Sequence, residues 1–318
     1  MNKLILVVLM MFTSLYAVKK DVTVSIVPQK YFVEKIAGDK ININVMVKPG
    51  FSPATYEPKT SQMKKLSNSS IYFAIGVPFE HIWLDKFKNA NKNMLIVHTD
   101  DGIEKLKMLK HSHHEEEHHD DEAHDDHEGD EHEGHDHEEE EHEHEHESSH
   151  EGHDHEDGLD PHIWNDPILV KKQATNIYQA LIKIDNENSA FYKTNYENFL
   201  KELDILDEKI SKILKPYEHK AFMVFHPSWG YFAKRYSLEQ VAIESEGKEP
   251  KPKELVELIK DAAEHKVKIV FVAPQFSQKS AKIIADNIKG NVLIIDPLVA
   301  NWDTNLIYTA EKIANTYK

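Results

Sequence analysis

Histidine and aspartate, two residue types that bind transition metals, follow apolar, strand-like runs of this sequence. His226 comes directly after the run AFMVF, and Asp296 comes directly after VLII. In open α/β sheets, ligands bind beyond the carboxyl ends of the strands, so both side chains stand where a binding site is expected. His162 lies within the segment DPHIWNDP, just before the expected start of a helix. Imidazole and carboxylate donors together are typical of a site for Zn²⁺ or a similar transition metal.

Another strand-like run, SIYFAIG, is followed a few residues later by Glu80 and His81. If His81 reached the same place as the residues above, three imidazoles and one carboxylate would make a tetrahedral zinc site. Each residue taken alone is also compatible with a structural role. An aspartate before a proline, as at Asp296, often forms a turn or caps a helix.

Short apolar, β-branched runs alternate with helix-like stretches along the chain. We expect strands at residues 22–27, 43–47, 70–75 and 94–98, and again at 221–225, 238–243, 267–272 and 292–295. Helical patterns lie between most of them, for example at 61–66, 79–87, 252–264 and 277–288. Because strands that alternate with helices form parallel sheets, the predicted fold class is α/β. It has two similar lobes, each with a mostly parallel four-stranded sheet and flanking helices.

The middle of the chain is predicted to be helical and to join the lobes. Residues 167–184 form one helix, with Asp166 as N-cap and Pro167 in the first turn. Residues 188–214 form a longer helix, which Pro216 ends. Such a helix is ~40 Å long, enough to run along one lobe and reach the next. We therefore expect an N-terminal lobe over 18–186, a rigid linking helix over 187–215 and a C-terminal lobe over 216–318.

Residues 111–157, here called the histidine-rich insert, differ in composition from the rest of the chain. They hold 16 of the 22 histidines and 24 acidic residues, with no lysine or arginine. Such a segment cannot bury enough apolar surface to offset the entropy of ordering, so it is predicted to be disordered. Histidine-rich tracts bind metals such as Zn, Ni and Cu, and we expect weak metal sites here. Outside the insert, 31 acidic residues stand against 38 basic ones, so the folded body is mildly basic.

The first 17 residues have the layout of a secretory signal, with Lys3, an apolar run and the small residues Ser14 and Ala17. Cleavage is expected after Ala17, and the apolar run is too short to span a bilayer. The absence of cysteine excludes disulfides and a lipid-modified cysteine, and it limits metal ligands to nitrogen and oxygen. The lysines are scattered, which argues against binding of nucleic acid. Outside the histidine-rich insert the sequence has no His-Glu-x-x-His motif, and it has no Gly-x-Ser-x-Gly nucleophile motif, so we do not expect an enzyme.

Six segments of the chain resemble the metal-specific solute-binding proteins of ABC importers, and in particular their ZnuA-type, zinc-uptake branch. They follow the family's order over almost the whole mature chain: KPGFSPATYEP (48–58), GVPFE (76–80), DPHIWNDP (160–167), FHPSWGYF (225–232), APQ (273–275) and DPL (296–298). The histidine-rich insert lies where that branch carries one. The resemblance implies two α/β lobes joined by a long helix, one metal ion in the cleft between them, and delivery of the ion to a membrane permease.

By this resemblance, His162 and His226 match two histidine ligands of the family, and Asp296 matches its carboxylate from the C-terminal lobe. The chain departs from the family at Ala54, where a histidine is usual. A methyl group cannot bind a metal ion, so one ligand of the family's site has to be replaced or lost.

The replacement for that histidine is open. We hypothesise that His81 supplies the missing imidazole, and Glu80 could bind the ion or orient one of its ligands. A site with three protein ligands and a water molecule is the alternative. Two histidines favour zinc over manganese, which prefers oxygen-rich sites, although the donor set also suits copper or nickel.

The sequence thus predicts a monomeric, periplasmic protein that binds zinc tightly at one site and works with an ABC permease. A transport protein for manganese or another transition metal is one alternative, and a metal-storage or adhesion protein is another. The histidine-rich insert is expected either to collect zinc at weak sites for the tight site or to sense excess zinc.

Overall fold

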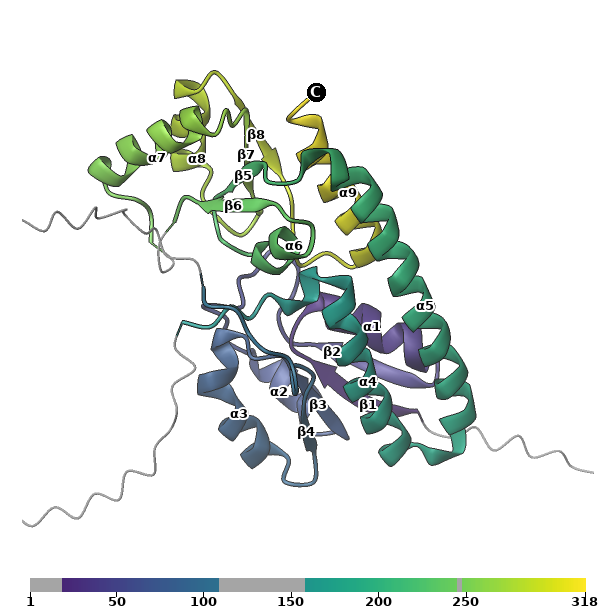
Figure 1. The fold of residues 1–318 in the computed structure, drawn as a ribbon. Coiled ribbons are helices and arrows are strands. Elements are labelled where there is room, and N and C mark those ends of the chain that lie inside the picture. Colours follow the sequence, from purple (N-terminus) through teal and green to yellow (C-terminus); the bar gives the residue numbers. More distant parts are fainter. Residues whose placement is uncertain (1–18, 109–157, 245–247) are drawn as a thin grey trace, which may run out of the picture. The chain divides into compact units, whose positions relative to one another are not determined.

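Two four-stranded parallel sheets form the framework of the computed structural model, which describes residues 19–108, 158–244 and 248–318 (Figure 1). The first sheet has the order β2-β1-β3-β4 and the second has β6-β5-β7-β8, so they share one topology. The fold class predicted from the sequence is confirmed. The strands are β1 (Lys20–Val24), β2 (Ile41–Val45), β3 (Ile71–Ala74), β4 (Leu95–His98), β5 (Ala221–Val224), β6 (Glu239–Ala242), β7 (Ile269–Val272) and β8 (Asn291–Ile294).

The apolar runs become strands because a parallel sheet is covered by helices on both faces. Every residue of β3 (IYFA) and β5 (AFMV), two strands inside their sheets, is buried. The edge strands β4 and β8 are instead exposed at both of their end residues. Their position at the sheet edge accounts for this difference in burial.

The helices cover the sheets and connect the strands. Their bounds are α1 (Val27–Ala37), α2 (Thr60–Leu66), α3 (Pro78–Ala90), α4 (Pro167–Ile184), α5 (Ser189–Leu214), α6 (Gly230–Arg235), α7 (Pro252–Glu264), α8 (Lys279–Asn287) and α9 (Trp302–Asn315). Helices α4 and α7 have the bounds predicted from the sequence. Asp166 is confirmed as the N-cap of α4, because its side chain accepts a hydrogen bond from Ile168 N at 2.7 Å.

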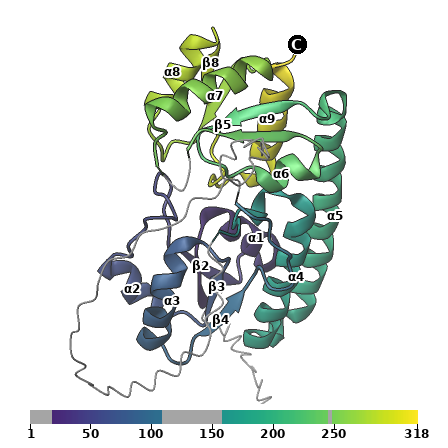
Figure 2. The same cartoon turned by 60° about the vertical axis from the view of Figure 1, so that its left-hand side comes forward.

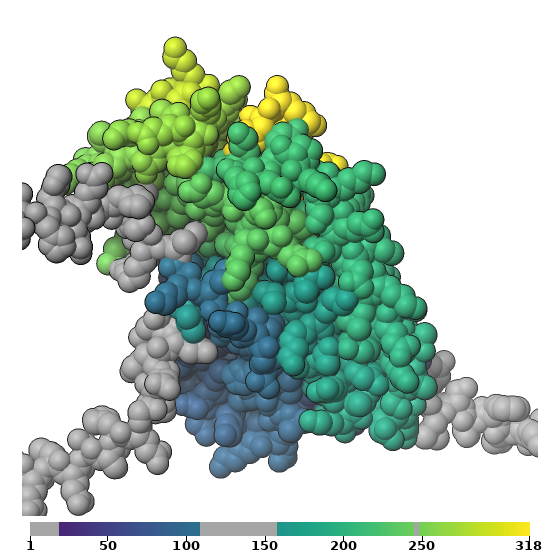
Figure 3. Space-filling model, in the orientation of Figure 1, coloured from purple at the N-terminus to yellow at the C-terminus, as the bar shows by residue number. Residues whose placement is uncertain are grey.

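Helix α5 joins the two lobes, as predicted. It packs against α1 and α4 of the first lobe and against α9 near the C-terminus (Figures 1 and 2). In the space-filling view the yellow C-terminal residues lie next to the end of α5 (Figure 3). Its buried side chains are spaced three, four or seven residues apart, which puts them on one helical face: Tyr192, Phe199, Leu203, Leu206, Ile210 and Leu214.

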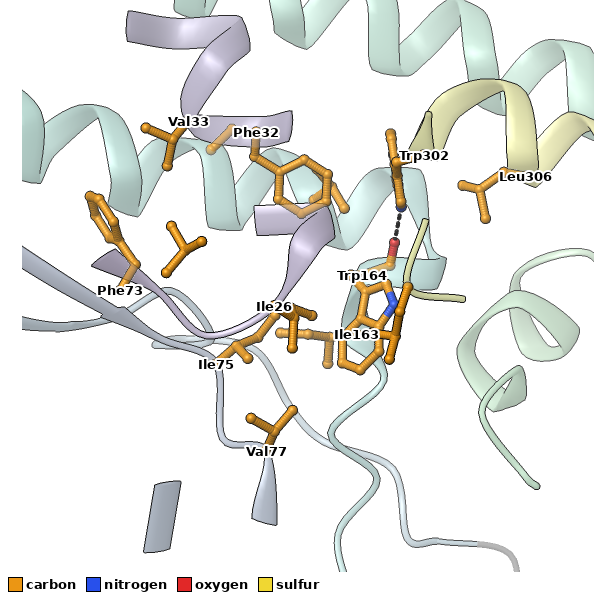
Figure 4. Close-up of a cluster of buried hydrophobic side chains, with 14 of the residues drawn as sticks. Ile26, Phe32, Val33, Phe73, Ile75, Val77, Ile163, Trp164, Trp302 and Leu306 are labelled. Atoms are coloured by element: carbon orange, nitrogen blue, oxygen red, sulfur yellow. Dashed lines mark hydrogen bonds between the residues drawn. The ribbon is translucent and has the colours of Figure 1, made fainter. Parts of the chain in front are cut away.

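Two buried tryptophans connect the segment after the insert to the C-terminal segment (Figure 4). Trp302 Nε1 donates to the carbonyl oxygen of Trp164 at 2.7 Å, and Trp164 Nε1 donates to that of Pro297 at 2.8 Å. Trp164 is two residues from His162, and Pro297 follows Asp296. These two buried hydrogen bonds therefore hold the main chain beside both predicted ligands.

Three helices, α1, α6 and α9, are absent from the elements named from the sequence. At the first of them the strand prediction extends to residue 27, whereas β1 ends at Val24 and α1 begins at Val27 with Pro28 in its first turn. Proline has a fixed φ that suits the first turn of a helix, and this overrides the apolar run. The predicted signal (1–17) and the histidine-rich insert lie outside the described residues. Within the described ranges, no helix has both the length and the apolar character needed to cross a membrane.

Candidate metal site

The topology of each sheet defines one place where a ligand is expected. In the second sheet, β5 is flanked by β6 on one side and β7 on the other, and open α/β sheets bind ligands at such switch points. His226 follows β5, and Gln275 follows β7. In the first sheet the switch point lies between β1 and β3, and Val77 and Pro78 follow β3. All four of these residues line one cavity.

This cavity has a volume of about 60 Å³ and is lined by residues of both lobes. Its wall is mainly apolar, so an ion inside it would interact with its ligands more strongly than in water. The lining residues are Ser52, Pro53, Ala54, Val77, Pro78, Met108, Pro161, His162, Trp164, His226, Gln275, Phe276, Pro297 and Leu298.

His162 and His226 face each other in the cavity, with ring centroids 5.2 Å apart and ring planes at 72°. A zinc-bound imidazole has its nitrogen at ~2.0–2.1 Å and its ring centroid about 3.2 Å from the ion. At the tetrahedral angle, two such rings would have centroids about 5 Å apart. The observed distance between the two rings fits a shared ion.

Each ring is fixed by its neighbours. His226 Nδ1 lies 2.6 Å from Glu244 Oε1, and the ring stacks on Phe276 with a centroid distance of 4.6 Å. His162 Nδ1 lies 2.7 Å from Asp160 Oδ1. Burial lowers the pKa of the His226 imidazole, against the opposing effect of its hydrogen bond with Glu244. The neutral imidazole is the form that binds metal ions, so this shift favours binding.

Asp296 does not line the cavity itself, but it is hydrogen-bonded to two residues that do. Its Oδ1 accepts hydrogen bonds from Leu298 N at 2.9 Å and from Gln275 Nε2 at 3.0 Å. Gln275 and Leu298 line the cavity, and Asp296 itself is half-buried behind them. Across residues 19–108, 158–244 and 248–318, no three His, Cys, Asp or Glu side chains are gathered closely enough to hold a metal ion. The structure thus brings His162 and His226 together, whereas Asp296 does not line the cavity and is hydrogen-bonded to Gln275, which does.

The Glu80 side chain is directed into the first lobe. It is 1% exposed and accepts hydrogen bonds from Ser25 Oγ, from Ile75 N at 3.2 Å and from Gly76 N at 2.7 Å. Burial raises the pKa of the Glu80 carboxyl to about 7, although these hydrogen bonds act in the opposite direction. The carboxylate therefore holds the turn that carries Val77 into the cavity wall.

His81 and Ala54 lie in different surroundings. His81 is exposed on the first turns of α3 and is not one of the residues that line the cavity. Ala54 is one of them, so the position where the family usually has a histidine does lie at the cavity. The structure does not bring His81 to the His162–His226 pair.

The raised pKa of Glu80 predicts that the protein becomes less stable as the pH rises. The folded pKa lies above the unfolded one, so the folded state binds this proton more tightly. The stabilisation is complete below the unfolded pKa and is lost as the pH rises through about 7. From about pH 5 to about pH 8 we expect the ionisation of Glu80 to lower the free energy of unfolding by on the order of 1–3 kcal/mol. The variant Glu80→Gln should lack this part of the pH dependence.

Urea denaturation of both proteins at the two pH values measures this difference. The exposed Glu57 provides the matched control, because Glu57→Gln makes the same chemical change in the same lobe. Identical pH slopes for the wild type and Glu80→Gln would show that Glu80 does not titrate in this range.

Three side chains at the site were not singled out by the sequence: Asp160, Glu244 and Gln275. Glu244 could have been found, because it directly follows a predicted strand, as His226 does. Asp160 and Gln275 lie within segments that carry the family resemblance, but nothing in their spacing distinguishes a ligand from a residue that holds one.

Comparison with known proteins places the chain among zinc-uptake proteins. The profile of the family described as "Zinc-uptake complex component A periplasmic" matches residues 22–316. The high-affinity zinc uptake system protein ZnuA of Bacillus subtilis is 27% identical over 287 residues, which cover 88% of this chain and 79% of that protein. The zinc-binding protein AdcA of Streptococcus pyogenes is 25% identical over 284 residues, and the match spans 50% of its length.

Solved structures agree with this grouping. A crystal structure of ZnuA is 38% identical, with a TM-score of 0.78 and coverage of 95% of this chain and 100% of that one. A zinc-bound ZnuA with residues 138–173 of its own chain deleted is 39% identical, with a TM-score of 0.77 and coverage of 94% and 98%. The laminin-binding protein of Streptococcus agalactiae, at 20% identity and a TM-score of 0.72, shares the fold.

Proposed function

The chain belongs to the zinc-uptake complex component A family, and on this basis we propose that it is an exported, monomeric protein that captures one Zn²⁺ and delivers it to an ABC permease. The family consists of solute-binding transport proteins and not of enzymes. The observation that carries the proposal is the pairing of His162 with His226 at a spacing that suits a shared ion, in a cavity with a mainly apolar wall.

His162 and His226 are the imidazole ligands in this proposal, and Asp296 is the carboxylate. Asp296 accepts a hydrogen bond from Gln275, a residue of the cavity wall, and in this proposal a change in side-chain torsions brings one of its oxygens to the ion. Two nitrogens and one oxygen suit zinc better than manganese, which prefers sites rich in oxygen. A water molecule completes the tetrahedron, and His81 is the alternative fourth ligand.

The histidine-rich insert serves in this proposal as a collector of weakly bound zinc. The described segments on either side of it are joined, because Lys107 and Leu159 form an antiparallel bridge and Asp160 N donates to the Leu106 carbonyl at 2.7 Å. Met108, just before the insert, lines the cavity. In this proposal, zinc bound weakly by the insert is passed on to the tight site.

A zinc titration of the full chain and of a variant without residues 112–153 tests the proposed binding. We expect one tight Zn²⁺ in both proteins and additional weakly bound zinc in the full chain alone, because the proposed tight ligands lie outside the deletion. A parallel titration should show weaker binding of Mn²⁺. Loss of the tight site on deletion, or a preference for Mn²⁺, would contradict the proposal.

Delivery to a permease requires a separate experiment in cells. A strain that lacks this gene is expected to grow poorly in medium depleted of zinc by a chelator. The wild-type gene should restore growth, and the variant His226→Ala should not. Equal growth with both genes would show that the protein does not supply zinc to the cell through this site.

A further inference from the structure

In each histidine of the pair, one ring nitrogen is hydrogen-bonded to a buried carboxylate. Asp160 Oδ1 lies 2.7 Å from His162 Nδ1 and also accepts from His162 N at 2.9 Å. Glu244 Oε1 lies 2.6 Å from His226 Nδ1. Asp160 and Glu244 are each 3% exposed, so water does not compete for these contacts.

These contacts determine which nitrogen of each ring carries the proton. A carboxylate oxygen accepts hydrogen bonds, so a bond to it requires a proton on Nδ1. A neutral imidazole with a proton on Nδ1 has its free lone pair on Nε2, and the lone pair is what binds a metal ion. Without the carboxylates both tautomers would be populated, and some molecules would present no lone pair to the cavity.

We propose that Asp160 and Glu244 are positioning residues that hold His162 and His226 as Nδ1–H tautomers, so that Nε2 of each ring is the zinc donor. This inference rests on the proposed zinc site and names its donor atoms. A carboxylate on the distal nitrogen also makes a histidine ligand more basic, and loss of such a partner typically lowers metal affinity about 10–100-fold.

The fold places Glu244 through the pairing of two strands. Strand β6 pairs in parallel with β5, and Glu244 N donates to the Phe225 carbonyl at 3.0 Å. Glu244 and His226 therefore follow neighbouring strands at the same edge of the sheet, where their side chains meet.

The fold places Asp160 through contacts with the C-terminal lobe. Its carbonyl oxygen accepts a hydrogen bond from the Tyr231 hydroxyl at 2.8 Å. Its carboxylate fills the space beside Gly230, where a Cβ atom would come within 2.8 Å of Oδ2. A side chain at position 230 would push this carboxylate away from His162. The orientation of His162, in the first lobe, thus depends on Gly230, in the second.

Zinc affinity of the full chain tests the proposal through matched substitutions. Asp160→Ala and Glu244→Leu remove the acceptor and should each weaken zinc binding about 10–100-fold. Asp160→Asn and Glu244→Gln keep an oxygen that can accept from Nδ1–H, so their losses should be smaller. Gly230→Ala should weaken binding as well, but it should add little to Asp160→Ala because both act through the same carboxylate.

The tautomers are measured directly by ¹⁵N NMR of the histidine rings in the metal-free protein. In the wild type, both rings should show protonated Nδ1 and unprotonated Nε2. Glu244→Leu should mix the two forms at His226, and Glu244→Gln should restore the wild-type spectrum, which a purely structural role would not predict. Asp207→Ala is the control, because Asp207 binds Arg235 and Tyr236 and neither histidine.

The outcomes separate this inference from the proposed function. If the wild type binds no zinc tightly, or if His226→Ala has no effect, the zinc site itself is wrong. If His226→Ala removes tight binding while Asp160→Ala and Glu244→Leu leave both affinity and tautomers unchanged, the site stands and the positioning role is wrong.

Discussion

Replacing His226 with alanine is expected to weaken zinc binding about 100–1000-fold. Structural sites with four protein ligands bind zinc with about 10–16 kcal/mol, so one protein ligand accounts for ~2.5–4 kcal/mol. A tenfold change in affinity corresponds to about 1.4 kcal/mol. Competition with a zinc chelator of known affinity measures the change, because a direct titration would not resolve so tight a site. His265→Ala, which removes an exposed histidine of the same lobe, should leave the affinity unchanged.

The same assay decides the role of His81. If a water molecule completes the site, His81→Ala should change the dissociation constant by less than about twofold. A loss as large as that of His226→Ala would make His81 a ligand and would mean that α3 moves toward the cavity when zinc binds. A His226→Ala protein with wild-type affinity would remove the physical basis of the proposed site.

Replacing Trp302 with alanine is expected to lower the free energy of unfolding by about 3–5 kcal/mol. The side chain is 1% exposed and packs edge-to-face on Phe32, with a centroid distance of 5.0 Å. Its Nε1 is the donor to the Trp164 carbonyl, which would be left buried without that bond. Domains of this kind are commonly stable by about 5–15 kcal/mol, so the change would be a large share of the total.

Urea denaturation followed by circular dichroism measures this loss. Trp83→Ala is the matched control, because Trp83 is half-buried on α3 with Lys86 Nζ 4.3 Å from its ring centroid. Its removal should cost far less than that of Trp302. Similar losses for the two variants would contradict the expected contribution of the buried Trp302 side chain to stability.

The fold could be predicted because its signals are local. Buried parallel strands are continuous apolar runs, and all eight predicted strands overlap strands of the structure. Helix α4 is preceded by a capping aspartate and has a proline in its first turn, so its start could be predicted from the sequence. The short helix α6 was missed because its sequence, GYFAKR, is too brief for a helical period and begins with glycine, a poor helix former.

The site could be predicted only in part, because a sequence places a residue along the chain but does not give the direction of its side chain. His226 lies at the cavity because it follows a central strand, β5. Glu80 follows another such strand, but it faces inward to accept hydrogen bonds from the free backbone N–H groups of Ile75 and Gly76. The position of Asp296 depends on Gln275, which is distant in sequence. Such long-range hydrogen bonds leave no periodic signal.

Because Lys107 and Leu159 form a bridge, we expect the stability of the body to depend little on the length of the chain between them. The entropy of closing a loop grows slowly with its length, and here the closing contacts belong to the body itself. A foreign domain could therefore be spliced in place of residues 112–153 while the body keeps its fold.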